Sequence, residues 1–93
     1  MAIRSIRHSG LRRLSERGDA SRLPAHRRAR IRIIMDALER SEALAALARP
    51  TFRLHRLKGN RKRQWAVTVS RHWRIVFRFE HGDAWDVDLV DYH

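Results

Sequence analysis

Three chemically capable side chains end the sequence: Asp91, Tyr92 and His93 are an acid, a phenol and an imidazole. A further imidazole, His55, lies in a stretch that we expect to be a strand. Cleavage of RNA by its own 2′-hydroxyl needs a base that deprotonates this hydroxyl and an acid that protonates the departing 5′-oxygen. His55, Asp91 and His93 are candidates for these roles, and Tyr92 could stack on a base or hydrogen-bond the phosphate.

Such a reaction also needs fixed cations around the phosphate, because negative charge builds up on its oxygens. Arg74 and Lys58 are the candidates for this contact. Other basic residues on the expected strands and their connecting loop are candidates for RNA binding: Arg53, Arg61, Lys62, Arg63 and Arg78. A lone histidine on a strand is more often structural or solvent-facing than catalytic, so spacing alone leaves both interpretations open.

The sequence predicts no metal site and no cofactor. Its His, Asp and Glu residues have no convincing metal-ligand spacing, and a glycine-rich phosphate loop is missing. There are 0 cysteines, which excludes disulfides and thiolate metal sites. The three tryptophans, Trp65, Trp73 and Trp85, are expected in the core or at its edges rather than as platforms for base stacking.

The length of the chain restricts the number of domains, and its charge restricts the class of partner. The 93 residues fit a single domain, residues 1–93, and carry 21 Lys and Arg against 10 Asp and Glu, a formal net charge of +11. Excess arginine, whose planar fork matches phosphate oxygens, favours nucleic acid over a membrane surface. The sequence has no apolar run of about 20 residues and no secretory signal at its start, so we expect a soluble cytoplasmic protein with no membrane partner.

Two segments of alternating residues surround the turn-forming stretch Glu80–Asp83. A period of two, with β-branched and aromatic residues around a Gly-Asp turn, is typical of a β-hairpin. In the first segment this alternation separates a core face from a polar face: Ile75, Phe77 and Phe79 against Arg74, Val76 and Arg78. In the second segment it separates Trp85, Val87 and Leu89 from Asp86, Asp88 and Val90.

The rest of the chain predicts helices first and strands last. Apolar spacing and capping residues indicate three helices, one capped by Ser9 and Gly18, one over Pro24–Arg40, and one over Glu42–Ala48 capped by Ser41. The expected strands before the hairpin are Ala2–Ile6, Phe52–Leu57 and Trp65–Ser70. This order predicts an α+β fold, a small antiparallel β-sheet with two to three N-terminal helices packed on one face. The candidate residues would gather on the opposite face.

Four stretches resemble the HigB toxin family, which belongs to the RelE-like toxins of bacterial type II toxin–antitoxin systems. They are Arg53-Leu54-His55-Arg56-Leu57-Lys58-Gly59, Trp65, Trp73-Arg74-Ile75-Val76-Phe77 and Val90-Asp91-Tyr92-His93. The resemblance covers nearly the whole chain and implies the same α+β, RelE-like fold. It also implies a ribosome-dependent endoribonuclease that inhibits translation by cleaving mRNA in the ribosomal A site, without metal, through attack of the 2′-hydroxyl.

The residues that match the family's active site are His55, Asp91, Tyr92 and His93, with Lys58 and Arg74 as basic supports. The implied partners are the ribosome and its mRNA, and a HigA-like helix-turn-helix antitoxin that would connect the toxin to operator DNA only indirectly. The sequence departs from the family in its more basic loop, 59–64. The competing interpretation of the charge is a non-catalytic basic RNA- or ribosome-binding module.

Overall fold

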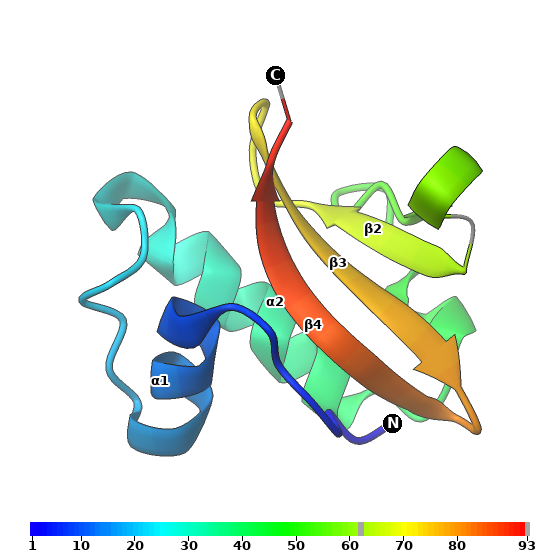
Figure 1. The fold of residues 1–93 in the computed structure, drawn as a ribbon, viewed down its shortest axis with the longest axis horizontal. Coiled ribbons are helices and arrows are strands. Elements are labelled where there is room, and N and C mark those ends of the chain that lie inside the picture. The colour runs from blue at the N-terminus through cyan, green and yellow to red at the C-terminus, as the bar shows by residue number, and fades with distance from the viewer. Residues whose placement is uncertain (62, 93) are drawn as a thin grey trace.

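The computed structural model describes residues 1–61 and 63–92 and consists of a four-stranded antiparallel sheet with helices on one side (Figure 1). The strands, in the order in which they pair, are β1 (His55–Arg56), β2 (Gln64–Thr68), β3 (Trp73–Glu80) and β4 (Asp83–Asp91). The helices are α1 (Ser9–Arg17) and α2 (Arg28–Arg40), with 3₁₀ turns at Ala25–Arg27, Leu44–Leu47 and Gly59–Arg61. The predicted α+β class is confirmed.

The first helix begins one residue earlier than predicted, at Ser9. His8 caps it, because its Nδ1 accepts the Leu11 N–H at 3.2 Å, so Ser9 is the first helical residue rather than the cap. Gly18 ends the helix as predicted, with a φ of 68° that costs a glycine little. Leu11 and Leu14 are buried on the face that meets the sheet.

The second helix begins later than predicted, at Arg28, after the 3₁₀ turn that follows Pro24. Its predicted core-facing stripe is confirmed, since all four of its apolar members are buried: Ile31, Ile34, Met35 and Leu38. The predicted cap at Ser41 is wrong. Its hydroxyl donates to the carbonyl of Ala37 and so helps to end α2, and the chain then forms only a 3₁₀ turn, Leu44–Leu47, in place of the expected helix.

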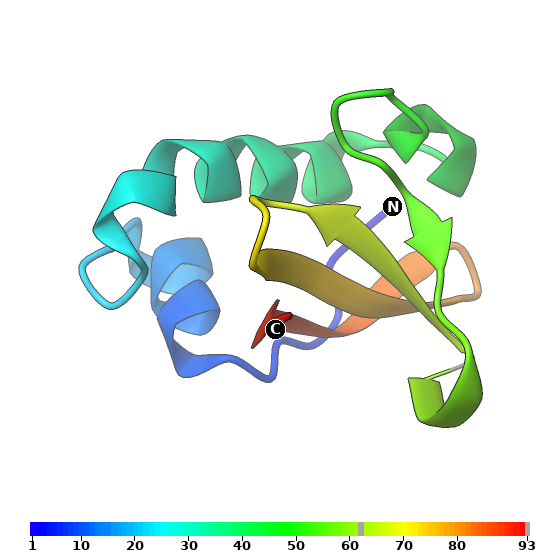
Figure 2. The same ribbon diagram turned by 90° about the horizontal axis from the view of Figure 1, so that it is seen from above.

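The core lies between the helices and one face of the sheet. In Figure 2, α2 crosses this face, whereas the turn at Gly59–Arg61 lies on the other side. Apolar side chains of β2, β3 and β4 meet those of both helices in one buried cluster, with Phe77, Ile75 and Val87 fully buried among them. Burial of a side chain of this size contributes roughly 1.5–3 kcal/mol.

The N-terminal segment covers the free edge of β4. The predicted strand Ala2–Ile6 forms only two isolated parallel bridges, Ile3 with Ala84 and Ile6 with Val87. The segment runs beside β4 in Figure 1. The Ile3 N–H also donates to Glu39 of α2 at 2.9 Å, so the segment ties the sheet edge to the helix layer.

The first strand is much shorter than the predicted Phe52–Leu57. Arg53 has a φ of 49°, in the left-handed region, and this interrupts the extended backbone before His55. Phe52 turns into the core instead, where it is 1% exposed and has the guanidinium carbons of Arg30 and Arg49 each 5.1 Å from its ring centroid.

The predicted hairpin of β3 and β4 is confirmed, with a two-residue turn at His81 and Gly82, whose φ angles of 52° and 79° suit tight hairpins. The predicted alternation along β4 fails at one point. The register shifts by a residue between Val76 and Arg78, and Asp86 has a φ of 53°. This bulge places Trp85 opposite Arg78, so Trp85 does not share the face of Val87 and Leu89 as the sequence suggested.

Candidate functional site

The sheet face opposite the helices, here called the open face, carries three of the residues predicted to be catalytic. His55 pairs with Ala66, which pairs with Val76, and Arg74 lies two residues before Val76 on β3. Side chains two residues apart on a strand share a face, so His55 and Arg74 both project from the open face. Tyr92 joins them, because its ring lies against Arg74.

The floor of this face is apolar, although the sequence suggested mainly polar residues. Ala66 and Val76 are fully buried there and Leu57 is 8% exposed, with Val90 packed against them. This small cluster holds the two-residue strand β1 on β2, and thereby fixes the backbone that carries His55.

The guanidinium of Arg74 is held in one orientation. Its Nη1 donates to the backbone carbonyls of Arg71 at 3.3 Å and Trp73 at 3.1 Å, and to that of Ser70. Its central carbon lies 5.3 Å from the ring centroid of Tyr92, at stacking distance. Its Nε is buried and has no hydrogen-bond partner among the described residues. Carbonyls orient this cation without cancelling its charge.

His55 is exposed, and its Nδ1 lies 2.9 Å from the carbonyl oxygen of Arg53. A carbonyl oxygen only accepts, so this hydrogen bond requires the proton on Nδ1. In the neutral ring Nε2 then has a free lone pair, which is the form that a general base needs. The left-handed Arg53 supplies this carbonyl, so the feature that shortens β1 also orients the imidazole.

Asp91 does not share the open face by register. It pairs with Trp73, which packs against the core on the helix side of the sheet, whereas the next residue, Tyr92, stacks on Arg74. Asp91 is exposed, so its carboxylate borders the end of the sheet rather than its open face. His93 lies outside the described residues.

Lys58 lies away from Arg74, in the loop between β1 and β2. It is exposed and lines a hollow of about 400 Å³ together with neighbouring residues of the loop: Arg56, Leu57, Gly59 and Arg63. The Leu57 N–H donates to the carbonyl of Gln64, and Gln64 pairs with Arg78, four residues along β3 from Arg74. The structure therefore places Lys58 at the Arg78 end of the sheet and separates the two predicted phosphate contacts.

The residues predicted to bind RNA fall into two groups. Arg53, Arg61 and Arg63 are exposed, and Arg61 donates to the side-chain oxygen of Gln64 at 3.1 Å. Lys62 lies outside the described residues. Arg78, in contrast, is only partly exposed.

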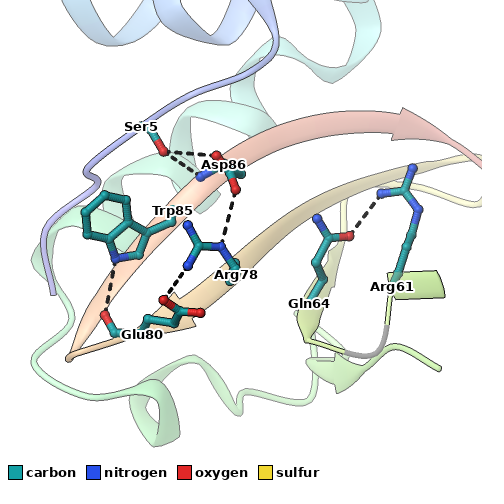
Figure 3. Close-up of polar contacts among 7 residues, drawn as sticks. All are labelled: Ser5, Arg61, Gln64, Arg78, Glu80, Trp85 and Asp86. Carbon is teal, nitrogen blue, oxygen red and sulfur yellow. Dashed lines mark hydrogen bonds and ion pairs between the residues drawn. The ribbon is translucent and has the colours of Figure 1, made fainter. Parts of the chain in front are cut away.

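Arg78 is occupied by other parts of the protein (Figure 3). It forms ion pairs with Glu80 and, at 3.3 Å, with Asp86, and lies 5.5 Å from the Trp85 ring centroid. These bonds raise the pKa of Arg78, and its hydrogen bond lowers the pKa of Glu80. Asp86 also accepts from the Ser5 hydroxyl at 3.3 Å. This position favours a structural role for Arg78, which clamps the β4 bulge.

The sequence interpretation did not identify two polar residues near the open face as parts of a site. Asp88 pairs with Val76 and so projects from the open face, where its Oδ1 accepts the Leu89 N–H at 2.9 Å. Arg7 reaches this region because its backbone N–H donates to the carbonyl of Val87 at 2.7 Å. The alternation of β4 could have indicated Asp88, but nothing local in the sequence places Arg7 beside the sheet.

Two further features concern residues 1–61 and 63–92 as a whole. Within them no group of three or more histidine or acidic side chains is arranged to hold a metal ion. Within them, too, no helix combines the length and apolar character needed to cross a membrane.

Comparison with known proteins gives two matches. The family model for the RelE-like toxin of the type II toxin–antitoxin system HigB matches residues 4–93. The chain is also 40% identical over 91 residues to a protein named endoribonuclease HigB from Proteus vulgaris, and the match covers 98% of this chain and 99% of that protein. Both matches extend over the helices as well as the sheet.

Proposed function

The chain belongs to the HigB-like family of RelE-like toxins, and we propose that it is an endoribonuclease that inhibits translation by cleaving mRNA in the ribosomal A site. The name of the Proteus vulgaris relative, endoribonuclease HigB, supports the endoribonuclease activity in this proposal. The observation that carries it is the fixed guanidinium of Arg74, stacked on Tyr92 on the sheet face from which His55 projects. The preoriented cation can bind a phosphate, the aromatic ring can stack on a base, and the imidazole can accept a proton.

The proposed reaction is attack by the 2′-hydroxyl on the adjacent phosphorus. His55 or His93 takes the proton of the hydroxyl, the O2′–P bond forms, and the P–O5′ bond breaks as the second group protonates the 5′-oxygen. The products are a 2′,3′-cyclic phosphate and a 5′-hydroxyl. Arg74 neutralises the charge on the oxygens of the cleaved phosphate, Tyr92 stacks on a base, and Asp91 assists the proton transfers. Lys58, in the loop before β2, contacts the RNA backbone at a neighbouring phosphate.

We further propose that cleavage depends on the ribosome and needs no metal. Among the described residues, the open face offers one firmly oriented cation that no carboxylate neutralises, and the candidate groups lie on separate strands. A ribosome that holds the mRNA in place would supply the missing orientation, an effect worth several kcal/mol. Side chains provide a base, an acid and cations, so this mechanism assigns no step to a metal ion.

Membership in a toxin–antitoxin family implies an antitoxin as partner. We propose a HigA-like helix-turn-helix protein that neutralises the toxin and connects it to operator DNA, so that the toxin meets DNA only indirectly. The site of action would be the cytoplasm, where mRNA is translated. The formal net charge of +11 suits both RNA and an acidic inhibitor.

Primer extension on mRNA tests this function. Purified protein should cut mRNA on translating ribosomes far faster than the same RNA alone, and leave 2′,3′-cyclic phosphate ends. Equal rates on both substrates would contradict ribosome dependence. Toxin that was treated with EDTA and dialysed before the assay should keep its activity, and recovery of lost activity with zinc or manganese would contradict the metal-free mechanism.

The same net charge favours one other candidate, a non-catalytic RNA- or ribosome-binding module. Both functions predict an affinity for RNA that falls steeply with salt. Only the enzyme produces cut mRNA, so intact mRNA at saturating protein would favour the binding module.

A further inference from the structure

A second basic region lies at the far end of β3 from Arg74. It is a hollow of about 530 Å³ lined by six side chains, four arginines and two amides: Arg7, Arg61, Arg63, Arg78, Asn60 and Gln64. These residues come from the N-terminal segment, the loop before β2 and the strands β2 and β3. We call this region the arginine hollow.

Backbone pairing brings these segments together. Gln64 pairs with Arg78 across β2 and β3, and both project from the open face in the row next to Ala66 and Val76. Figure 3 shows Gln64 between Arg61 and the ion-paired Arg78. Arg7 is positioned from the other edge of the sheet by its hydrogen bond to Val87.

The arginines of the hollow are not equivalent. Arg78 is neutralised by its two carboxylates, whereas Arg7, Arg61 and Arg63 form no ion pair among the described residues. Hydrogen bonding from Arg78 is the main reason that the pKa of Glu80 is lowered, and the charge of Arg63 adds to it, so Arg63 lies close to this pair. Uncompensated cations that share one hollow repel each other, and an anion bound between them would relieve this repulsion.

The distance between the arginine hollow and Arg74 indicates which anion fits the hollow. Arg74 and Arg78 are four residues apart on β3, a distance of about 13 Å along an extended strand. One phosphate cannot contact both ends. A single RNA strand that places its scissile phosphate at Arg74 can continue along the open face and bring another of its phosphates to the hollow.

We propose that the arginine hollow binds the phosphodiester backbone of the substrate RNA strand, at a phosphate distant from the cleaved bond. Arg7, Arg61 and Arg63 provide the charge, and Asn60 and Gln64 add amide groups that hydrogen-bond phosphate or ribose. This inference rests on the proposed function only in that RNA is the substrate. It assigns no role in proton transfer to the hollow.

The test is the salt dependence of binding to an RNA of about ten nucleotides in which every 2′-hydroxyl is methylated, so that it cannot be cleaved. The double variant Arg7→Ala, Arg63→Ala is compared with Arg17→Ala, Arg22→Ala. The control removes two exposed arginines from α1 and the following loop, and so changes the net charge equally. Circular dichroism should show that both variants fold, because all four side chains are exposed or unpaired among the described residues.

For single strands the logarithm of the binding constant falls with the logarithm of salt concentration at a slope of about −0.7 per phosphate contact. Because the hollow is proposed to bind one phosphate, the hollow variant should lose about 0.7 from the slope, and the control should keep the wild-type slope. Equal slopes for all three proteins would overturn the proposal. The phosphates of ribosomal RNA are the other possible ligand of the hollow, and binding to empty ribosomes tests them. If the hollow variant loses affinity for ribosomes but keeps the wild-type slope with the oligonucleotide, the hollow binds ribosomal RNA and the proposal is overturned.

This binding assay does not depend on catalysis. A protein that binds the methylated RNA through the hollow but never cuts mRNA would contradict the proposed function and leave the hollow supported. If the protein cuts mRNA but all variants bind the methylated RNA with the same salt slope, the proposed function would be supported and the role of the hollow would be contradicted.

Discussion

Replacing Arg74 by alanine tests the candidate site and the end of the sheet in a single experiment. The sequence alone predicted a surface position, where substitutions usually change stability by no more than about 0.5 kcal/mol. The structure predicts a larger loss, because the half-buried side chain of Arg74 connects two carbonyls of the turn before β3 and one at the start of β3 to the ring of Tyr92.

The magnitude follows from these contacts. Nη1 carries two hydrogens, so its three carbonyl contacts count as at most two hydrogen bonds, each worth about 1.5–3 kcal/mol when the donor is charged. Stacking on Tyr92 adds about 0.5–1 kcal/mol at an exposed site. The side chain is only half-buried and desolvation of Nε opposes these gains, so we expect a net loss of about 1–3 kcal/mol. At about 4–8 °C per kcal/mol for a domain of this size, the midpoint should fall by roughly 4–24 °C.

Cleavage should fall by at least about 100-fold, the usual effect of removing one oriented donor to a transition state. Thermal unfolding by circular dichroism gives the stability, and primer extension well below the midpoint of the variant gives the activity. Arg71→Ala is the matched control, because Arg71 is exposed and only its backbone carbonyl contacts Arg74. Arg74→Lys keeps the charge without the planar fork and should fall between wild type and alanine. A folded Arg74→Ala protein with wild-type cleavage would refute the assignment of the phosphate to Arg74.

Three other predictions follow from single features. Deletion of His93 should abolish mRNA cleavage in primer extension with little change in the thermal midpoint, and His93→Gln should weaken cleavage; unchanged cleavage in the deletion would transfer its role to His55 and Asp91. Gly82→Ala should cost about 1–2 kcal/mol in chemical denaturation, because φ is 79° there and a side chain is strained at such an angle. Arg4, then the Ala2 N–H, lowers the pKa of Asp83. This carboxylate therefore stabilises the fold above its unfolded pKa of about 4, and the free energy of unfolding should fall as the pH drops below this value, less so in Asp83→Asn.

The elements that sequence patterns predicted well are those whose signals are local. The stripe Ile31, Ile34, Met35 and Leu38 is repeated at helical spacing, and its burial needed no knowledge of the rest of the chain. Gly82 next to Asp83 similarly marked a hairpin whose turn the structure confirms. Both features depend on periodicity or on a backbone conformation that few residues adopt.

The elements that were misplaced depend on distant contacts. Alternation suggested a strand from Phe52 to Leu57, but Phe52 is needed in the core and the backbone reverses at Arg53 to put it there. Alternation also put Trp85 in the core, and the bulge at Asp86 reverses this. That bulge is held by Ser5 and Arg78, the first of which is 81 residues away in sequence. No local window contains this information.

The same limit applies to the candidate site, and Arg74 and Arg78 show why. The two arginines lie four residues apart on one strand and project from the same face, so a sequence pattern treats them alike. Acidic partners at the end of β3 and at the bulge neutralise Arg78, whereas uncharged carbonyls hold Arg74. A carbonyl fixes the direction of a cation but does not cancel its charge, and an anion that approaches the open face still experiences the full charge of Arg74. The groups that hydrogen-bond each arginine, rather than the residue type, therefore decide which arginine can bind a phosphate.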